Sequence, residues 1–217
     1  VRGVVEEHRI FVGNIASVSS KSAIFQIKSF KVAIIDEASQ ILEPSLVGIL
    51  CAKNQNAKSA IDKFILIGDH KQLPAVVVQS QENSVETQIE LQKIGMTDRR
   101  NSMFERLYGL YKENEKLCHT LTKQGRMHED IVLFPSYSFY KGELEIVPTS
   151  HQKKQLEFSN IDSENPIHKL IASKRLVFIP SEENNDENDI KTNIWEARIV
   201  AKLVENIKKV CLLNGIK

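Results

Sequence analysis

Short runs of apolar residues alternate along the chain with segments that show the three-to-four spacing of amphipathic helices. Three of these runs are closed by acidic residues, glycine or proline: Lys31 to Ile35, Phe64 to Ile67 and Arg175 to Ile179. Short apolar runs with such boundaries are typical of central parallel strands, which are covered on both faces. We therefore predict buried strands at these three places, with a fourth candidate from Arg9 to Gly13.

Helices are expected between the strands. One begins around Pro44, which suits the first turn of a helix, and runs to about Ala52. Another opens at Ser102, which forms an S-x-x-E capping box with Glu105. The last begins near Thr192. Strands that alternate with helices predict an α/β fold with a parallel sheet. In the first of these helices, the residues predicted to face inward are Leu46, Val47, Ile49 and Leu50.

The composition is that of an ordinary globular protein, with 41% hydrophobic and 26% charged residues among 217. The net charge of +1 excludes a polybasic nucleic-acid coat but leaves a local basic groove open. A membrane span needs about 20 apolar residues, and the longest apolar run here has four. Without a signal-peptide pattern, we expect a cytoplasmic or nuclear protein that is not secreted. The acidic run from Pro180 to Asp189 is predicted to be a solvated loop, and the polar stretch from Pro148 to Asn165 a linker or insertion.

Candidate chemistry follows the first two strands. Asp36 and Glu37 come directly after one apolar run, and a polar loop from Gly68 to Pro74 follows the next. In open parallel sheets, ligands gather at the carboxyl ends of strands. One carboxylate can hold Mg²⁺ and its neighbour can deprotonate a water molecule. Taken alone, each segment is a weak signal that a plain polar turn at the end of a strand also explains.

A third candidate lies in the second half of the chain. Arg126 belongs to the segment Gln124 to His128, just before a predicted helix. An arginine that reaches a phosphate from another lobe can stabilise the charge that develops during phosphoryl transfer. For a lone arginine, the alternative is a surface residue beside a helix start.

The three segments together resemble the superfamily 1 helicases, in the branch of Upf1-like RNA helicases and Dna2-like nuclease-helicases. The most diagnostic stretch runs from Gln124 to His128, followed by Phe134-Pro135 and by Phe139 to Leu144. The predicted helix from Ser102 to Leu107 also resembles a helix of that family. The resemblance implies RecA-like parallel-sheet lobes of the P-loop NTPase type. Residues 1–117 would be the back of the first lobe, and residues 118–217 the front of the second.

The resemblance also implies roles for individual residues. Asp36 would hold the Mg²⁺ that bridges the nucleotide phosphates, and Glu37 would be the general base. Gln72 would sense the γ-phosphate, and Arg126 would be an arginine finger from the second lobe. Other nucleotide-binding positions would be Asp69, Gln124 and Gly125. Nucleic acid would be contacted near Asn14, Ser17, His70 and Pro74.

Gly125 departs from the family pattern, because an aromatic residue usually precedes the arginine and stacks on the nucleotide base. Such a stack is worth about 1–3 kcal/mol by analogy with nucleic-acid stacking. We therefore predict a looser preference for the base. Hydrolysis need not suffer, since the other residues of the site act on phosphates.

The phosphate-binding loop G-x-x-x-x-G-K-[S/T] is absent, because none of the nine glycines is followed by lysine. The family places that loop upstream of Asp36, so it is expected before Val1, and the rest of the second lobe is expected after Lys217. The implied activity is that of an ATP-dependent helicase or translocase with ATP and Mg²⁺ as cofactors and single-stranded DNA or RNA as partner. The chain alone is expected to be inactive.

Three other classes remain as alternatives. The main one is a non-catalytic helicase-like module that binds nucleic acid or acts as a scaffold. A different phosphate-loop ATPase of the AAA type fits the loop from Gly68 to Pro74 less well. A metal hydrolase fits least, because the six histidines show no H-x-x-x-H pair.

Overall fold

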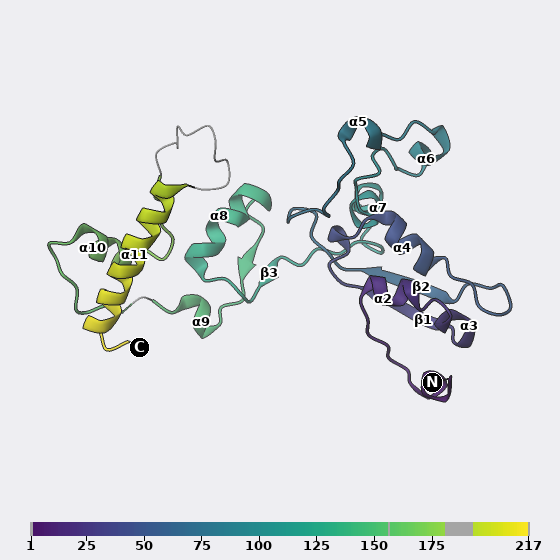
Figure 1. The fold of residues 1–217 in the computed structure, drawn as a ribbon, viewed down its shortest axis with the longest axis horizontal. Helices are drawn as coiled ribbons and strands as arrows, with labels where there is room; N and C mark the ends of the chain where they lie inside the picture. The colour runs from purple at the N-terminus through teal and green to yellow at the C-terminus, as the bar shows by residue number, and fades with distance from the viewer. Residues whose placement is uncertain (1, 156, 181–192, 217) are drawn as a thin grey trace. The chain divides into compact units, whose positions relative to one another are not determined.

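The computed structural model describes residues 2–155, 157–180 and 193–216. The chain divides into two compact units, Val1–Thr120 and Leu121–Lys217, whereas the boundary expected from the sequence lies between residues 117 and 118. Each unit contains a small parallel sheet and several helices (Figure 1). The fold is therefore mixed α/β, in agreement with the predicted class.

The sheet of unit 1 pairs β1 (Phe30–Ile35) with β2 (Ile61–Leu66) in parallel, from Phe30 opposite Ile61 to Ile35 opposite Leu66. These are the first two predicted strands. Parallel strands need a crossover connection, and here it contains the short 3-10 helix η1 (Ala38–Gln40) and α4 (Glu43–Leu50). The β-α-β order brings the carboxyl ends of both strands to the same edge of the sheet.

The two strands are half exposed, so the prediction of burial on both faces is wrong. Ile34 is 66% exposed and Phe64 is 46% exposed, whereas Ile35 and Ile61 are buried. In the described part of unit 1, the sheet has only these two strands. By the strand register, Ile35 shares a face with Phe64 and Ile61 shares a face with Ile34, so each face of the sheet carries both buried and exposed side chains.

The core of unit 1 lies between the sheet and its helices. It consists of two clusters of buried side chains: Phe25, Ile49, Ala60 and Ile61 in one, and Ile35, Ala38, Leu46 and Met103 in the other. Leu46 and Ile49 face inward from α4, as predicted. Val47 is 41% exposed, because it lies about 100° around the helix from Leu46.

The N-terminal part of unit 1 contains three short helices: α1 (Arg2–Glu7), α2 (Ile15–Ser20) and α3 (Ile24–Ile27). The strand predicted from Arg9 to Gly13 is not formed. This segment is an irregular connection between α1 and α2, and no strand in the described part of unit 1 pairs with it. The ring of Phe11 instead meets the ring of Phe30 edge-on, with 5.4 Å between centroids.

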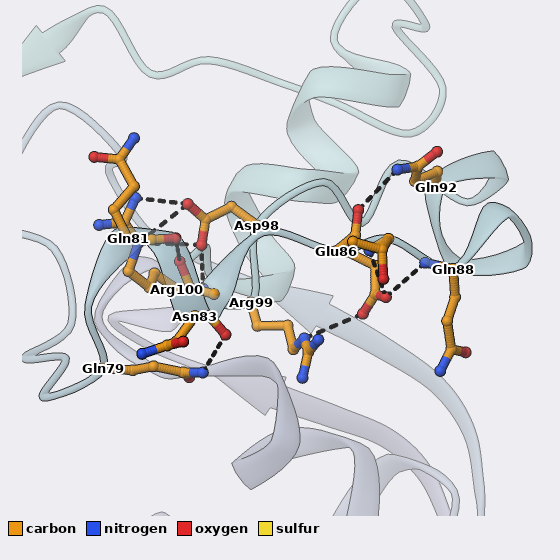
Figure 2. Close-up of polar contacts among 11 residues, drawn as sticks. Gln79, Gln81, Asn83, Glu86, Gln88, Gln92, Asp98, Arg99 and Arg100 are labelled. Atoms are coloured by element: carbon orange, nitrogen blue, oxygen red, sulfur yellow. Dashed lines mark hydrogen bonds and ion pairs between the residues drawn. The ribbon is translucent and has the colours of Figure 1, made fainter.

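Between β2 and α7 (Met103–Tyr111), the chain makes an excursion over residues 79–101 that contains α5 (Gln81–Ser84) and α6 (Ile89–Lys93). One ion pair links separated parts of this excursion, because Arg99 Nε lies 3.1 Å from Glu86 Oε2, and a second pair is local, with Arg100 Nη2 2.6 Å from Asp98 Oδ2 (Figure 2). After it, Ser102 Oγ accepts the Glu105 N–H at 3.1 Å. This bond caps α7, so the predicted helix start is confirmed.

In unit 2, β3 (Lys123–Gln124) and β4 (Glu145–Ile146) pair in parallel, and α8 (Glu129–Phe139) connects them. Among the described residues that follow, the helices are α9 (Ser150–Lys153), α10 (Pro166–Ser173) and α11 (Ile194–Leu213). Of these, α10 packs beside α11 (Figure 1). Thr192, the predicted start of the last helix, lies outside the described residues, as does the predicted acidic loop beyond Pro180.

The strand predicted from Arg175 to Ile179 is also not formed. These residues adopt irregular structure, and Phe178 is 88% exposed. An apolar run becomes a strand only when a neighbouring strand takes up its backbone hydrogen bonds, and none in the described part of unit 2 pairs with it. Over the same described ranges, no helix is both long enough and apolar enough to cross a membrane.

Candidate functional site

The loops that follow β1 and β2 lie directly against each other. The Ile67 N–H donates to the Ile35 carbonyl, and the Ala38 N–H donates to the Ile67 carbonyl, both at 2.8 Å. Next along the chain, the Asp69 N–H donates to Ser39 Oγ at 3.1 Å. These bonds continue the strand pairing into the loops. They bring the acidic pair after β1 and the polar loop after β2 to one edge of the sheet.

Glycine at position 68 is required by this close approach of the two loops. A Cβ atom at this position would lie 2.8 Å from the Ser39 backbone nitrogen and 3.3 Å from Phe104 Cδ2. Real Cβ contacts are not that short with backbone atoms. Only glycine lets the second loop pass so close to the first.

Asp36 and Glu37 are both exposed at this edge. Glu37 has a left-handed backbone conformation with φ of 52°, which is uncommon for a residue with a side chain. Its N–H donates to Asp36 Oδ1 at 3.0 Å, and its Oε2 accepts the Gln40 side-chain amide at 3.3 Å. Non-glycine residues in such conformations occur often at functional sites.

The loop after β2 is organised around the carboxylate of Asp69. Its Oδ1 accepts the Lys71 N–H at 3.0 Å, and its Oδ2 accepts the side-chain amide of Gln72 at 2.9 Å. Asp69, expected to bind nucleotide, thus orients the amide of Gln72. Pro74, at the end of the loop, is exposed.

Three of the residues predicted to contact nucleic acid have structural contacts in unit 1. The His70 ring lies 4.6 Å from the Tyr108 ring of α7, measured between centroids. Asn14 caps α2, because its Oδ1 accepts the Ser17 N–H at 2.8 Å. Their predicted role in binding nucleic acid is not tested by these contacts.

Arg126 lies in unit 2, in a loop between β3 and α8 that is shaped by the side chain of Gln124. Gln124 Oε1 accepts the N–H groups of Arg126 and Met127 at 2.8 and 2.7 Å, and its Nε2 donates to the Met127 carbonyl at 3.0 Å. The Arg126 side chain is exposed. Gly125 has open space around it, since a Cβ atom added at this position would have no packing neighbour within 4 Å. No close packing therefore requires glycine at this position.

Sequence reasoning missed the residues that hold this loop. Gln152 is fully buried, and its Nε2 donates to the carbonyls of Gln124 and Met127, both at 2.9 Å. His151 Nε2 lies 2.8 Å from the Gly125 carbonyl oxygen. Both residues fall in the stretch that the sequence suggested was a linker or insertion, because isolated polar residues without a period carry no signal.

The described residues contain no group of three or more histidine, cysteine, aspartate or glutamate side chains that could hold a metal ion. This absence does not disfavour Mg²⁺, which is commonly held by one or two carboxylates together with substrate phosphates and water.

Two family models, each described as an AAA domain, match the chain over residues 2–80 and residues 99–214. The second covers more than half of the 217 residues. With the relatives below, these matches show that the chain belongs to the Upf1-like and Dna2-like branch of the superfamily 1 helicases, whose domains have the P-loop NTPase fold.

The relatives come from vertebrates and yeast. The DNA replication ATP-dependent helicase/nuclease DNA2 of Xenopus laevis is 30% identical over 216 residues, which cover 89% of this chain and 17% of the relative. The DNA polymerase alpha-associated DNA helicase A of Schizosaccharomyces pombe is 34% identical, over 79% of this chain and 23% of the relative. The 3'-5' exoribonuclease HELZ2 of Mus musculus is 36% identical, over 64% of this chain and 4% of the relative. The chain thus spans less than a quarter of each.

Proposed function

We propose that this chain is part of an ATP-dependent helicase or translocase that couples ATP hydrolysis to movement along single-stranded DNA or RNA. The observation that carries the proposal is the joined edge of the unit 1 sheet, where Asp36, Glu37 and Gln72 follow two hydrogen-bonded parallel strands. Family membership supports it. In this proposal, residues 1–117 and 118–217 are incomplete RecA-like lobes of a longer protein in the cytoplasm or nucleus, and the phosphate loop lies in its upstream part.

Asp36 fits the Mg²⁺ of a bound Mg–ATP. It is an exposed carboxylate at the end of a parallel strand, and its donor atoms are the hard oxygens that Mg²⁺ prefers. When bound, Mg²⁺ neutralises part of the negative charge on the phosphates. The Glu37 carboxylate takes the proton from the attacking water, as a general base.

Gln72 and Arg126 act on the phosphates in this scheme. Asp69 orients the Gln72 amide, which reports the loss of the γ-phosphate to the nucleic-acid-binding surface near Asn14, Ser17, His70 and Pro74. Arg126 stabilises the charge that develops on the transferred group. Gln124 and Gly125 place its loop beside the nucleotide.

The test uses the parent protein with the phosphate-loop segment and the rest of the second lobe. Glu37→Gln is expected to keep ATP binding and lower hydrolysis by about 10²–10⁴-fold, because the base is lost while the shape stays. Arg126→Ala is expected to lower the rate by about 10³-fold with little change in nucleic-acid affinity. Glu113→Gln, at an exposed position in unit 1, serves as the control and leaves the rate unchanged.

Normal ATP turnover in both variants would show that the roles are wrong. A parent protein that binds nucleic acid but never hydrolyses ATP would favour the scaffold alternative. The 217-residue chain itself is expected to show no turnover, because it lacks the phosphate loop. Turnover by the chain alone that disappears in Glu37→Gln would contradict this part.

A further inference from the structure

We propose that the segment Thr149–Lys154, hereafter the latch, positions the loop that carries Arg126, and that Gln152 is its central positioning residue. The inference rests on the proposed function of Arg126 as the residue that acts on the phosphates. It assigns a role to a part of unit 2 that lies outside every motif of the sequence.

The side chain of Gln152 is buried and fully hydrogen-bonded. Its Nε2 donates to the carbonyls of Gln124 and Met127, both at 2.9 Å, and its Oε1 accepts the Thr149 hydroxyl at 2.9 Å. A buried amide must have its hydrogen bonds satisfied within the protein, because the loss of a partner costs the desolvation of the other group. Gln152 therefore specifies one arrangement of the loop.

Two histidines add further ties between the loop and the latch. His151 Nε2 lies 2.8 Å from the Gly125 carbonyl oxygen, so this nitrogen carries a proton and donates. On His128, Nδ1 accepts the Asp130 N–H at 3.1 Å. Its Nε2 therefore carries the proton, which it donates to the Lys154 carbonyl at 3.1 Å.

These contacts fix the backbone both before and after Arg126 in the sequence. The carbonyls of Gln124, Gly125 and Met127 are each bonded to the latch, while the Arg126 side chain itself is exposed. An exposed side chain on a backbone with fixed neighbours is preorganised for a ligand. A misplacement of about 1 Å can lower a rate by about 10²-fold, so loss of the latch is expected to slow catalysis without removing a catalytic group.

The decisive variant is Gln152→Glu in the parent protein. Glutamate keeps the size and still accepts from Thr149, but it cannot donate to the two carbonyls. The kcat for ATP hydrolysis is expected to fall by about 10²-fold, while the KM for ATP and the affinity for single-stranded nucleic acid stay within about twofold. Gln155→Glu, the same change at an exposed glutamine nearby, is expected to leave all three unchanged.

The double variant Gln152→Glu/Arg126→Ala separates positioning from a general structural effect. If Gln152 acts through Arg126, the double variant is no slower than Arg126→Ala alone. A double variant slower by the full factor of Gln152→Glu would overturn the inference. So would an unchanged kcat in Gln152→Glu.

Hydrogen exchange distinguishes failure of this inference from failure of the proposed function. In the wild-type chain, the amides of Arg126 and Met127 are expected to be protected, and in Gln152→Glu they are expected to exchange faster. If Arg126→Ala does not slow hydrolysis, the proposed function fails, while the exchange result still decides whether the latch holds the loop. If Gln152→Glu fails to fold, His151→Ala, at an exposed position, takes its place. This variant is expected to give a smaller loss of kcat and faster hydrogen exchange at the Arg126 amide. No change in kcat or in exchange would overturn the inference.

Discussion

The candidate residues of the two units are held in place in different ways. In unit 1, the two motif loops support each other: the Ala38 N–H bonds the Ile67 carbonyl, and Gly68 allows the contact with Ser39. In unit 2, the loop of Arg126 shapes itself through Gln124 but is otherwise held by residues more than 20 positions downstream. Two motifs that support each other can both be recognised in a sequence. Residues that support a motif from outside it cannot be recognised in the same way.

The largest expected effect concerns the ion pair that joins α4 and α7 in unit 1. Arg106 of α7 donates to both carboxylate oxygens of Glu43 in α4 and to the Ile94 carbonyl, and both charged side chains are nearly buried. The hydrogen bonds that Arg106 donates to Glu43 raise the pKa of Arg106 above its ordinary value. Glu43→Ala leaves this charge without its partner, so we expect a loss of about 3–5 kcal/mol in the free energy of unfolding.

Urea denaturation measures this loss, with Glu6→Ala as the control. Glu6 forms an exposed ion pair with Arg2, so its removal is expected to cost less than about 1 kcal/mol. A loss below about 1 kcal/mol in Glu43→Ala would mean that α4 and α7 do not depend on this pair. The support of the unit 1 edge would then have to come from apolar packing alone.

The next prediction compares glycines in the two units. Gly68→Ala places a Cβ against the Ser39 backbone, so we expect a loss of about 1–3 kcal/mol in the free energy of unfolding. Gly125→Ala meets open space and is expected to be nearly neutral. Gly48→Ala, in the interior of α4 and also in open space, is expected to stabilise by about 0.5–1 kcal/mol. Equal losses in Gly68→Ala and Gly125→Ala would remove the contrast between the loops.

The smallest expected effect is on the acid stability of unit 1. Hydrogen bonds from Arg100 hold the pKa of Asp98 well below its ordinary value of 3.8, and bonds from the Gln88 backbone and Arg99 lower the pKa of Glu86. A carboxyl with a lowered folded-state pKa stabilises the fold above its ordinary pKa. This contribution is lost as the pH falls through the folded-state value.

Asp98→Asn is therefore expected to unfold at nearly the same urea concentration as the pH is lowered from about 5 to about 2, after subtraction of the slope due to other groups. The wild type is expected to lose stability faster over that range. Identical pH slopes in the two proteins would show that the ion pair of Asp98 with Arg100 does not contribute to the acid stability of unit 1. No carboxylate takes part in the contacts between the latch and the Arg126 loop. Those contacts are therefore not expected to weaken through protonation of a carboxylate between about pH 5 and about pH 2.

Much of unit 1 could be predicted because its signals are local. The apolar runs of β1 and β2, and the cap from Ser102 to Glu105, depend on neighbouring residues and on periodicity. The strands expected from Arg9 to Gly13 and from Arg175 to Ile179 are not formed, because a strand needs a partner and an apolar run does not show whether one exists. The same reason explains why Ile34 and Phe64 are half exposed.

The sequence by itself determined the class of protein, the order of its candidate chemical groups and the absence of a phosphate loop. Those features are residue types at short spacing, which do not depend on the fold. Only the tertiary structure decided that Gly68 serves a close approach, and that Gln152 is buried against the Arg126 loop. Hydrogen bonds between segments 25 to 30 residues apart leave no pattern along the chain, since their partners are chosen by how the elements pack.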